Sequence, residues 1–220
     1  MKKYKYILFD LDGTLIFSHF GIIEGMRYAL KQIGKTEKDF TDEQIKDSIG
    51  PSKVEAFKTH FHLTETEAVT ASNIYYSWYL EKGIERCYLV DNVLETLKCL
   101  KEKNYILSVV TLKPQIFAEK ILHNLHISKF FTVLVGASLS NVHSGKRELI
   151  INAQQLLHAD SSQCLLVGDR KGDIESATSL KMDAALFLRG YASKQEIQAL
   201  QALQVKYRFT NFSDLISLIE

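Results

Sequence analysis

From residue 91 to the end of the chain, short apolar runs alternate with segments of helical length. Strands are predicted at 105–110, 131–135, 164–167, 184–188 and 207–209. Helices are predicted at 91–103 and 114–125, from Lys146, after Asp173, at 193–203 and after Asn211. Strands that alternate with helices in this way are typical of a parallel sheet with helices on both faces. The predicted fold class is therefore α/β, with a doubly wound parallel sheet.

A further strand is predicted near the start of the chain. Residues 4–9 are almost continuously apolar or aromatic, which is typical of a strand buried on both faces of a parallel sheet. The run ends at Asp10, and residues 10–15 read Asp-Leu-Asp-Gly-Thr-Leu. Ligands of doubly wound sheets bind beyond the carboxyl ends of the strands. This acidic segment is therefore predicted to lie at the functional edge of the sheet.

Between the first strand and the alternating region, the pattern is helical. Apolar side chains recur at helical spacing over residues 22–33. The spacings Thr41-x-x-Gln44 and Thr64-x-x-Glu67 are capping boxes that begin two more helices. A helical insert is therefore predicted directly after the first strand.

This pattern divides the chain into two predicted domains. Residues 1–16 and 85–220 are expected to form the α/β core, and residues 17–84 an inserted helical domain. A chain of 220 residues is long enough for one large core and a smaller second domain.

The composition excludes several classes of partner. The net charge of +1 provides no field that would attract nucleic acid or an acidic membrane surface. Apolar runs fall short of the about 20 residues that span a bilayer. Cys87, Cys99 and Cys164 form no Cys-x-x-Cys pair and are predicted to be reduced thiols of a cytoplasmic protein. We expect neither nucleic acid nor membrane as a partner, and either a monomer or a homodimer.

Four polar clusters fall at predicted strand ends or helix starts. They are Asp10 with Asp12, Thr111 with Lys113, Lys146, and Asp169 with Asp173. The first, second and fourth follow strands, and the third opens a helix. Because these points meet at one edge of a doubly wound sheet, the clusters are expected to converge.

These residue types suit phosphoryl transfer. The acids of the first and fourth clusters can hold Mg²⁺, which prefers oxygen ligands. An aspartate can act as the nucleophile, while metal and lysine offset the repulsion between carboxylate and phosphate. A carboxylate two residues along, at Asp12, suits a general acid that later acts as a base.

Other residues of the clusters have supporting parts. Gly13 permits a positive φ, and backbone N–H groups there and after Thr111 are expected to cradle phosphate oxygens. Lys113 either approaches the phosphate or merely flanks Pro114. Asp173 either supports the metal site or is the N-cap of the following helix.

Residues 10–15 resemble the first motif of the haloacid dehalogenase superfamily. Residues 110–111 look like its second motif, Lys146 like its third, and residues 168–173 like its fourth. The resemblance covers nearly the whole chain. Within this superfamily, the phosphoglycolate phosphatase-like branch is the one that the chain resembles, in the segments 21–23, 49–51, 111–114 and 168–171.

The resemblance implies a Rossmann-like core with an inserted helical cap domain. It makes Asp10 the nucleophile and a metal ligand, and Asp12 the acid/base whose backbone carbonyl also binds Mg²⁺. Thr111 and Lys146 would bind the phosphoryl group, and Asp169 would complete the metal site. The supporting residues would be Asp173, Gly13 and Lys113.

The predicted function is that of a magnesium-dependent phosphatase, which hydrolyses a small, phosphoglycolate-like phosphate monoester through an aspartyl-phosphate. Two enzymatic alternatives remain open: a sugar phosphomutase and a 5'-nucleotidase acting on nucleoside monophosphates. A non-catalytic phosphate-binding protein is disfavoured because the predicted catalytic acids are intact. A receiver-type signalling domain is disfavoured by the long insert after the first strand.

Overall fold

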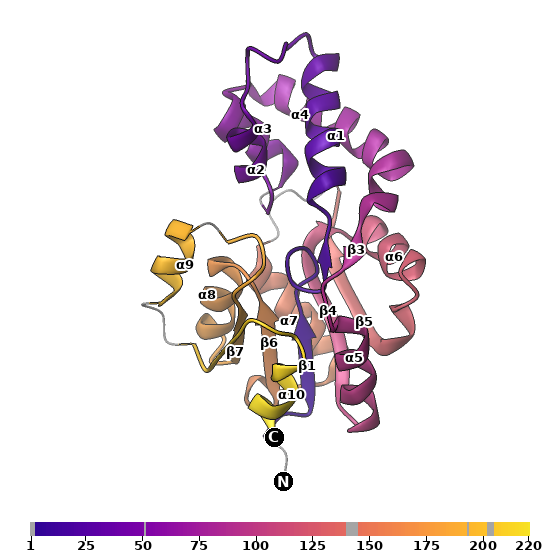
Figure 1. The fold of residues 1–220 in the computed structure, drawn as a ribbon, viewed down its shortest axis with the longest axis vertical. Coiled ribbons are helices and arrows are strands. Elements are labelled where there is room, and N and C mark those ends of the chain that lie inside the picture. Colours follow the sequence, from indigo (N-terminus) through magenta and orange to yellow (C-terminus); the bar gives the residue numbers. More distant parts are fainter. Residues whose placement is uncertain (1–2, 51, 140–144, 193, 202–204) are drawn as a thin grey trace. The chain divides into compact units, whose positions relative to one another are not determined.

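The computed structural model (Figure 1) describes all residues except 1–2, 51, 140–144, 193 and 202–204. The chain forms two compact units, Met1–Phe17 with Leu89–Glu220, and Ser18–Tyr88. We refer to them as unit 1 and unit 2. The ends of the helix predicted at 193–203 lie outside the described residues, and helix α9 is seen over Lys194–Gln201.

Unit 1 contains a six-stranded sheet with the order β5-β4-β1-β6-β7-β8. Its strands are β1 (Tyr6–Phe9), β4 (Ile106–Pro114), β5 (Phe131–Ala137), β6 (Cys164–Gly168), β7 (Asp183–Phe187) and β8 (Tyr207–Phe209). All neighbouring pairs are parallel. Strand β1 lies between β4 and β6, so the segment that follows it emerges at the middle of the sheet. The predicted α/β fold with a parallel sheet is confirmed.

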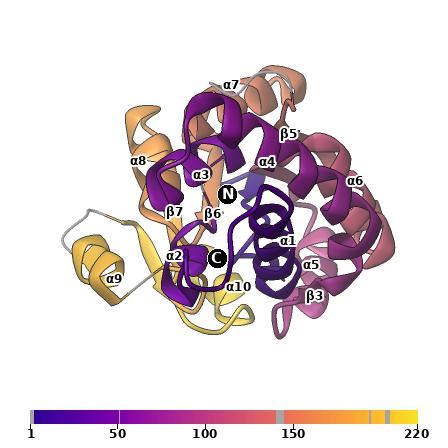
Figure 2. The same ribbon diagram turned by 90° about the horizontal axis from the view of Figure 1, so that it is seen from above.

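Helices cover both faces of this sheet. They are α5 (Val93–Glu102), α6 (Gln115–Asn124), α7 (Lys146–Leu157), α8 (Lys171–Ser179), α9 and α10 (Asp214–Ile219), with the 3₁₀ turns η3 (Ser128–Phe130) and η4 (Ser161–Gln163). Figure 2 shows α7 and α8 on the opposite side of the sheet from α5 and α10. Successive strand residues point to opposite faces of the sheet. Leu8 and Leu166 belong to the core beneath α7 and α8, whereas Phe9 stacks on Phe212, which precedes α10.

Unit 2 is helical, as predicted for the insert. It contains α1 (His19–Gln32), α2 (Asp42–Asp47), α3 (Lys53–Phe61), α4 (Glu65–Trp78), the π-helical turn η1 (Tyr79–Gly83) and the 3₁₀ turn η2 (Ile84–Arg86). Both predicted capping boxes are formed, at the starts of α2 and α4. Helices α1 and α3 pack against α4. The buried rings of Tyr75 and Tyr79 stack with centroids 5.4 Å apart, so they contribute to the core of unit 2.

Two short strands were not predicted. Strands β2 (Ile16–Phe17) and β3 (Tyr88–Leu89) pair with each other in a separate two-stranded sheet. Beside them, the Val90 N–H donates to the Leu15 carbonyl at 3.0 Å. The chain therefore leaves and re-enters unit 1 at neighbouring positions. Strands of two residues are too short to show a period-2 pattern.

Two of the boundaries that differ from the sequence prediction lie beside the predicted site residues. Strand β4 continues to Pro114, beyond the predicted end at Thr111. Its pairing with β5 shifts register between these two residues, so the residues between them form a β-bulge. Helix α8 begins at Lys171, before Asp173 rather than after it. Across the described part of the chain, every helix is too short or too polar to span a bilayer.

Candidate active site

Three predicted residues meet beyond the carboxyl ends of the central strands. Asp10 follows β1, Lys146 is the first residue of α7, and Asp173 lies in the first turn of α8. The Lys146 ammonium forms ion pairs with both carboxylates, and its Nζ is 2.8 Å from the Asp173 Oδ1. All three residues are buried, with exposed fractions of 8% or less. One buried lysine thus forms ion pairs with two carboxylates.

Burial governs the charge of this group. It raises the pKa of Asp10 to about 7, because the ionised form loses its water, although the Lys146 ammonium acts in the opposite direction. Burial also disfavours the charge of Lys146, but the carboxylates of Asp10 and Asp173 raise its pKa above the ordinary value. Lys146 is therefore a fixed positive charge at neutral pH.

Asp169 follows β6 and is fully buried beside this group. The Thr14 hydroxyl donates to its Oδ1 at 3.2 Å, and the Tyr191 N–H donates to its Oδ2 at 2.6 Å. Burial and the neighbouring carboxylates of Asp10 and Asp173 raise the pKa of Asp169 well above its ordinary value. Two hydrogen bonds fix the Asp169 carboxylate, and burial makes its negative charge unfavourable. A bound cation would offset that charge.

The acidic residues offer a suitable donor set for a hard cation. Asp10, Asp169 and Asp173 each provide a carboxylate oxygen, and these oxygens lie within 4.8 Å of one another. Magnesium binds oxygen ligands and commonly uses one or two carboxylates together with phosphate and water. The residues present therefore fit Mg²⁺.

Three glycines let the backbone approach these acids closely. A Cβ on Gly13 would lie 2.4 Å from the Asp169 Oδ2, and its φ of +84° is the positive value predicted from the sequence. A Cβ on Gly190 would lie 2.3 Å from the same oxygen, and one on Gly168 would lie 2.4 Å from the Asp173 Cγ. Any side chain at these positions would displace an acid of the cluster.

We expect Gly190→Ala to lower the free energy of unfolding by about 1–3 kcal/mol, the usual range for overpacking. It should also weaken Mg²⁺ binding, because the new methyl group pushes Asp169 aside. Thermal unfolding and Mg²⁺ titration by calorimetry measure the two effects. Gly172→Ala is the matched control, since no atom lies within 4 Å of its added Cβ. Equal behaviour of the two variants would contradict the role assigned to this close approach.

Asp12 and Lys113 form a second, separate ion pair. The Lys113 Nζ lies 2.9 and 2.8 Å from the two carboxylate oxygens of Asp12. The Lys113 N–H also donates to the Thr111 hydroxyl at 3.1 Å. Lys113 is 8% exposed and Thr111 is 1% exposed. The alternative that Lys113 merely flanks Pro114 is therefore wrong, because its side chain enters the site.

Two expectations from the sequence need correction. The Gly13 N–H donates to the Ile16 carbonyl at 2.8 Å and the Thr14 N–H to the Leu11 carbonyl, so the turn itself uses these two of the N–H groups expected to cradle phosphate. Asp173 is not an N-cap. It lies in the first turn of α8, where its Oδ2 accepts the Arg170 N–H at 3.1 Å.

The residues that hold Asp169 were not predicted from the sequence. Thr14 belongs to the first motif but was assigned no role, and Tyr191 was not considered. The Arg170 guanidinium donates to the Tyr191 carbonyl at 2.7 Å and lies 3.5 Å from Glu196, which steadies this loop. Residues 190 and 191 follow the end of β7, and that position at the functional edge was the available signal.

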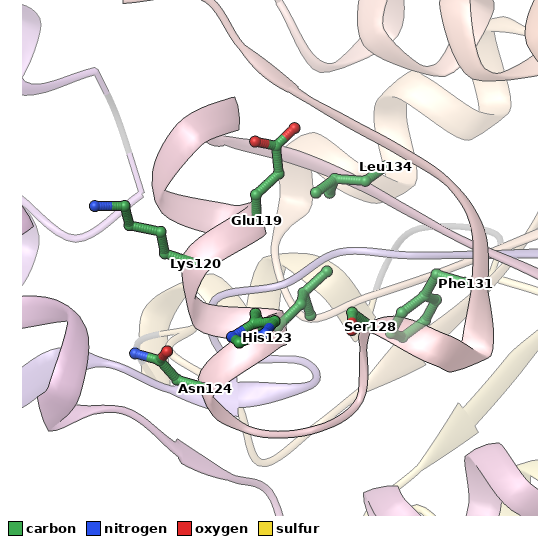
Figure 3. Close-up of a pocket in the computed structure, with 8 residues that line it drawn as sticks. Glu119, Lys120, His123, Asn124, Ser128, Phe131 and Leu134 are labelled. Atoms are coloured by element: carbon green, nitrogen blue, oxygen red, sulfur yellow. The ribbon is translucent and has the colours of Figure 1, made fainter.

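A pocket of about 440 Å³ lies elsewhere in unit 1 (Figure 3). Helix α6, the turn η3 and strand β5 form its walls. Figure 3 labels Glu119, Lys120, His123, Asn124, Ser128, Phe131 and Leu134 around it. The lining of this pocket includes none of the predicted site residues.

The chain is similar to known proteins over most of its length. A sequence profile of haloacid dehalogenase-like hydrolases matches residues 7–187. A 5'-nucleotidase from Pseudomonas aeruginosa is 29% identical over 90% of this chain and 89% of its own. A phosphoglycolate phosphatase from Aquifex aeolicus is 26% identical over 98% of this chain and 97% of its own. The structure of a haloacid dehalogenase-like hydrolase from Streptococcus pneumoniae aligns with a TM-score of 0.88 at 26% identity, covering 100% of both chains. The matched range contains every predicted site residue.

Proposed function

The chain belongs to the haloacid dehalogenase-like hydrolase family, as its sequence motifs predicted, and on this premise we propose that it is a Mg²⁺-dependent phosphatase. Its substrate is a small phosphate monoester similar to phosphoglycolate, and the reaction passes through an aspartyl-phosphate on Asp10. One observation carries the proposal: the buried Lys146 ammonium is paired with Asp10 and Asp173, next to Asp169. With Mg²⁺ bound to the acids, this arrangement at the end of β1 would suit an anionic phosphoryl group.

In the first step, an oxygen of the Asp10 carboxylate forms a bond to phosphorus. The bond between phosphorus and the ester oxygen breaks, and its electron pair remains on that oxygen. Asp12 enters this step as the carboxylic acid, gives its proton to the same oxygen and becomes a carboxylate, and the alcohol leaves. The Lys146 ammonium offsets the repulsion between the Asp10 carboxylate and the phosphate dianion.

In the second step, the Asp12 carboxylate takes a proton from water. The water oxygen bonds to phosphorus, and the bond between phosphorus and Asp10 breaks, which returns an electron pair to the carboxylate. Phosphate leaves, and both aspartates are restored. The Thr111 hydroxyl accepts the Lys113 N–H, so its own proton is available to a phosphate oxygen.

The metal would be held by the carboxylates of Asp10 and Asp169 and by the backbone carbonyl of Asp12, with Asp173 supporting the site. When bound, Mg²⁺ neutralises phosphate charge and orients the phosphoryl group. The Thr14 hydroxyl and the Tyr191 N–H keep the Asp169 carboxylate in place for it.

A second candidate is a 5'-nucleotidase that acts on nucleoside monophosphates. The Pseudomonas aeruginosa relative, which carries that name, supports it. The chemistry at Asp10 is the same in both candidates, and they differ only in the alcohol that leaves.

The experiment is a screen of phosphorylated metabolites that measures released phosphate in the presence of Mg²⁺. We expect turnover of phosphoglycolate, with nucleoside monophosphates as the comparison set. EDTA should abolish the activity and excess Mg²⁺ should restore it, because the acidic cluster carries more negative charge than Lys146 alone can offset. Full activity in EDTA would remove the metal from the proposal. Preference for nucleoside monophosphates would favour the second candidate.

A further inference from the structure

Lys113 lies in the β-bulge of β4. Thr111 pairs with Gly136 and Pro114 pairs with Ala137, so two residues of β4 have no counterpart in the ladder of β5. Bulges of this kind re-aim side chains, and they recur beside active sites. The two residues within this bulge differ in exposure: Leu112 is 39% exposed, whereas Lys113 is 8% exposed. Of these two neighbours, Lys113 is the one whose side chain points into the protein.

Two contacts fix what Lys113 does there. Its ammonium contacts both carboxylate oxygens of Asp12, at 2.9 and 2.8 Å, and its side chain is 5% exposed. Its backbone N–H holds the Thr111 hydroxyl oxygen at 3.1 Å. An ion pair with so little exposure is only weakly screened by solvent. Lys113 thus connects the proposed proton-transfer group with a proposed phosphate ligand.

We infer that Lys113 is a positioning residue: it holds the Asp12 carboxylate in the place from which Asp12 exchanges a proton with the leaving oxygen. The inference rests on the proposed phosphatase function. It assigns Lys113 an action through Asp12, distinct from that of Lys146, which contacts the nucleophile. General acid–base catalysis depends on hydrogen-bond geometry at the reacting atom, so a displaced acid loses much of its effect.

The test compares kcat/KM for 4-nitrophenyl phosphate, which has a good leaving group, with kcat/KM for phenyl phosphate, which has a poorer one. This constant includes only the steps up to departure of the alcohol. Asp12→Ala should raise the ratio of the two constants, because only the poorer leaving group needs a proton. Lys113→Met should raise the ratio in the same direction, by roughly tenfold. In the double variant, Lys113→Met should add little to the effect of Asp12→Ala.

Further variants separate positioning from phosphate binding and from loss of fold. Lys113→Arg should keep a ratio near that of the wild type, because a guanidinium also grips a carboxylate through two hydrogen bonds. The exposed Lys120 provides the control variant Lys120→Met, which should leave both constants unchanged. Thermal unfolding checks each variant, and Lys113→Gln replaces Lys113→Met where that variant unfolds.

The overturning results are distinct. Equal losses for both aryl phosphates, with a raised inhibition constant for inorganic phosphate, would make Lys113 a phosphate ligand and refute the inference. Additive losses in the double variant would refute it too. Lack of turnover by the wild type, or turnover that survives Asp10→Asn, would instead refute the proposed function and the inference with it.

Discussion

Asp10→Asn is expected to lower kcat/KM for an aryl phosphate by about 10⁴-fold or more, the scale on which an enzyme loses a covalent nucleophile. The amide has nearly the shape of the carboxylate but is a far weaker nucleophile toward phosphorus. Release of 4-nitrophenol at saturating Mg²⁺ measures the loss. A phosphorylated protein, detected by intact mass after acid quenching, should form in the wild type and be absent from the variant.

The fold should survive this substitution. Burial raises the pKa of Asp10 to about 7, which shows that ionising this group in the interior is unfavourable, and a neutral amide avoids that penalty. The melting temperature of Asp10→Asn should therefore match or exceed that of the wild type in EDTA. Asp91→Asn is the control, since Asp91 is exposed in the turn before α5. More than about one per cent residual activity in a folded Asp10→Asn protein would contradict the nucleophile assignment.

Lys146→Met should damage both activity and stability. Loss of the ammonium removes the group that offsets charge on the transferring phosphoryl, so we expect kcat/KM to fall by about 10²–10³-fold. It also leaves the buried carboxylates of Asp10 and Asp173 without their counter-charge. Removing one partner of a buried ion pair typically costs about 3–5 kcal/mol. Denaturant unfolding in EDTA measures this loss.

The stability loss should depend on pH with a definite sign. Burial raises the folded-state pKa of Asp10, so the protonated form is favoured in the native protein. Such a group stabilises the folded protein below its unfolded-state pKa of about 3.9. This stability is lost as the pH rises through the folded-state pKa. Without Lys146 that folded value rises further, since the ammonium lowers it. The deficit of Lys146→Met should therefore be smaller at pH 5 than at pH 8.

Arg147→Met is the matched control for this prediction. Arg147 is the neighbouring cation on α7, and its side chain is 50% exposed. Its removal should leave both activity and stability close to wild type, because exposed ion pairs contribute little. A pH-independent deficit in Lys146→Met would indicate lost packing rather than uncompensated charge.

The sequence was sufficient to predict the sheet and the convergence of its polar ends. Strand β1 is a continuous apolar run, and Asp10, Lys146 and Asp169 lie at strand ends or a helix start that parallel topology brings together. These features depend on periodicity, which a single sequence displays directly.

Other parts of the site depend on local geometry that periodicity does not encode. Lys113 lies in a bulge of β4, and the apolar pattern of a strand does not show where its pairing with a neighbour shifts register. The hold on Asp169 comes in part from a backbone N–H at Tyr191, and every residue except proline carries that group. Strands β2 and β3, with two residues each, are too short to leave a pattern.

The pairing of β2 with β3 also bears on how the chain folds. In the central sheet, Tyr6 must pair with Ile106 across the whole of residues 18–88, and such distant pairings slow folding because a long loop must close first. Unit 2 is compact by itself, and the chain enters and leaves it through adjacent strands. Once unit 2 has formed, its two ends lie side by side, so only the short segments outside it add to the entropy of closing the loop between β1 and β4. The insert therefore lowers the entropic barrier that its own length would otherwise impose on assembly of the sheet.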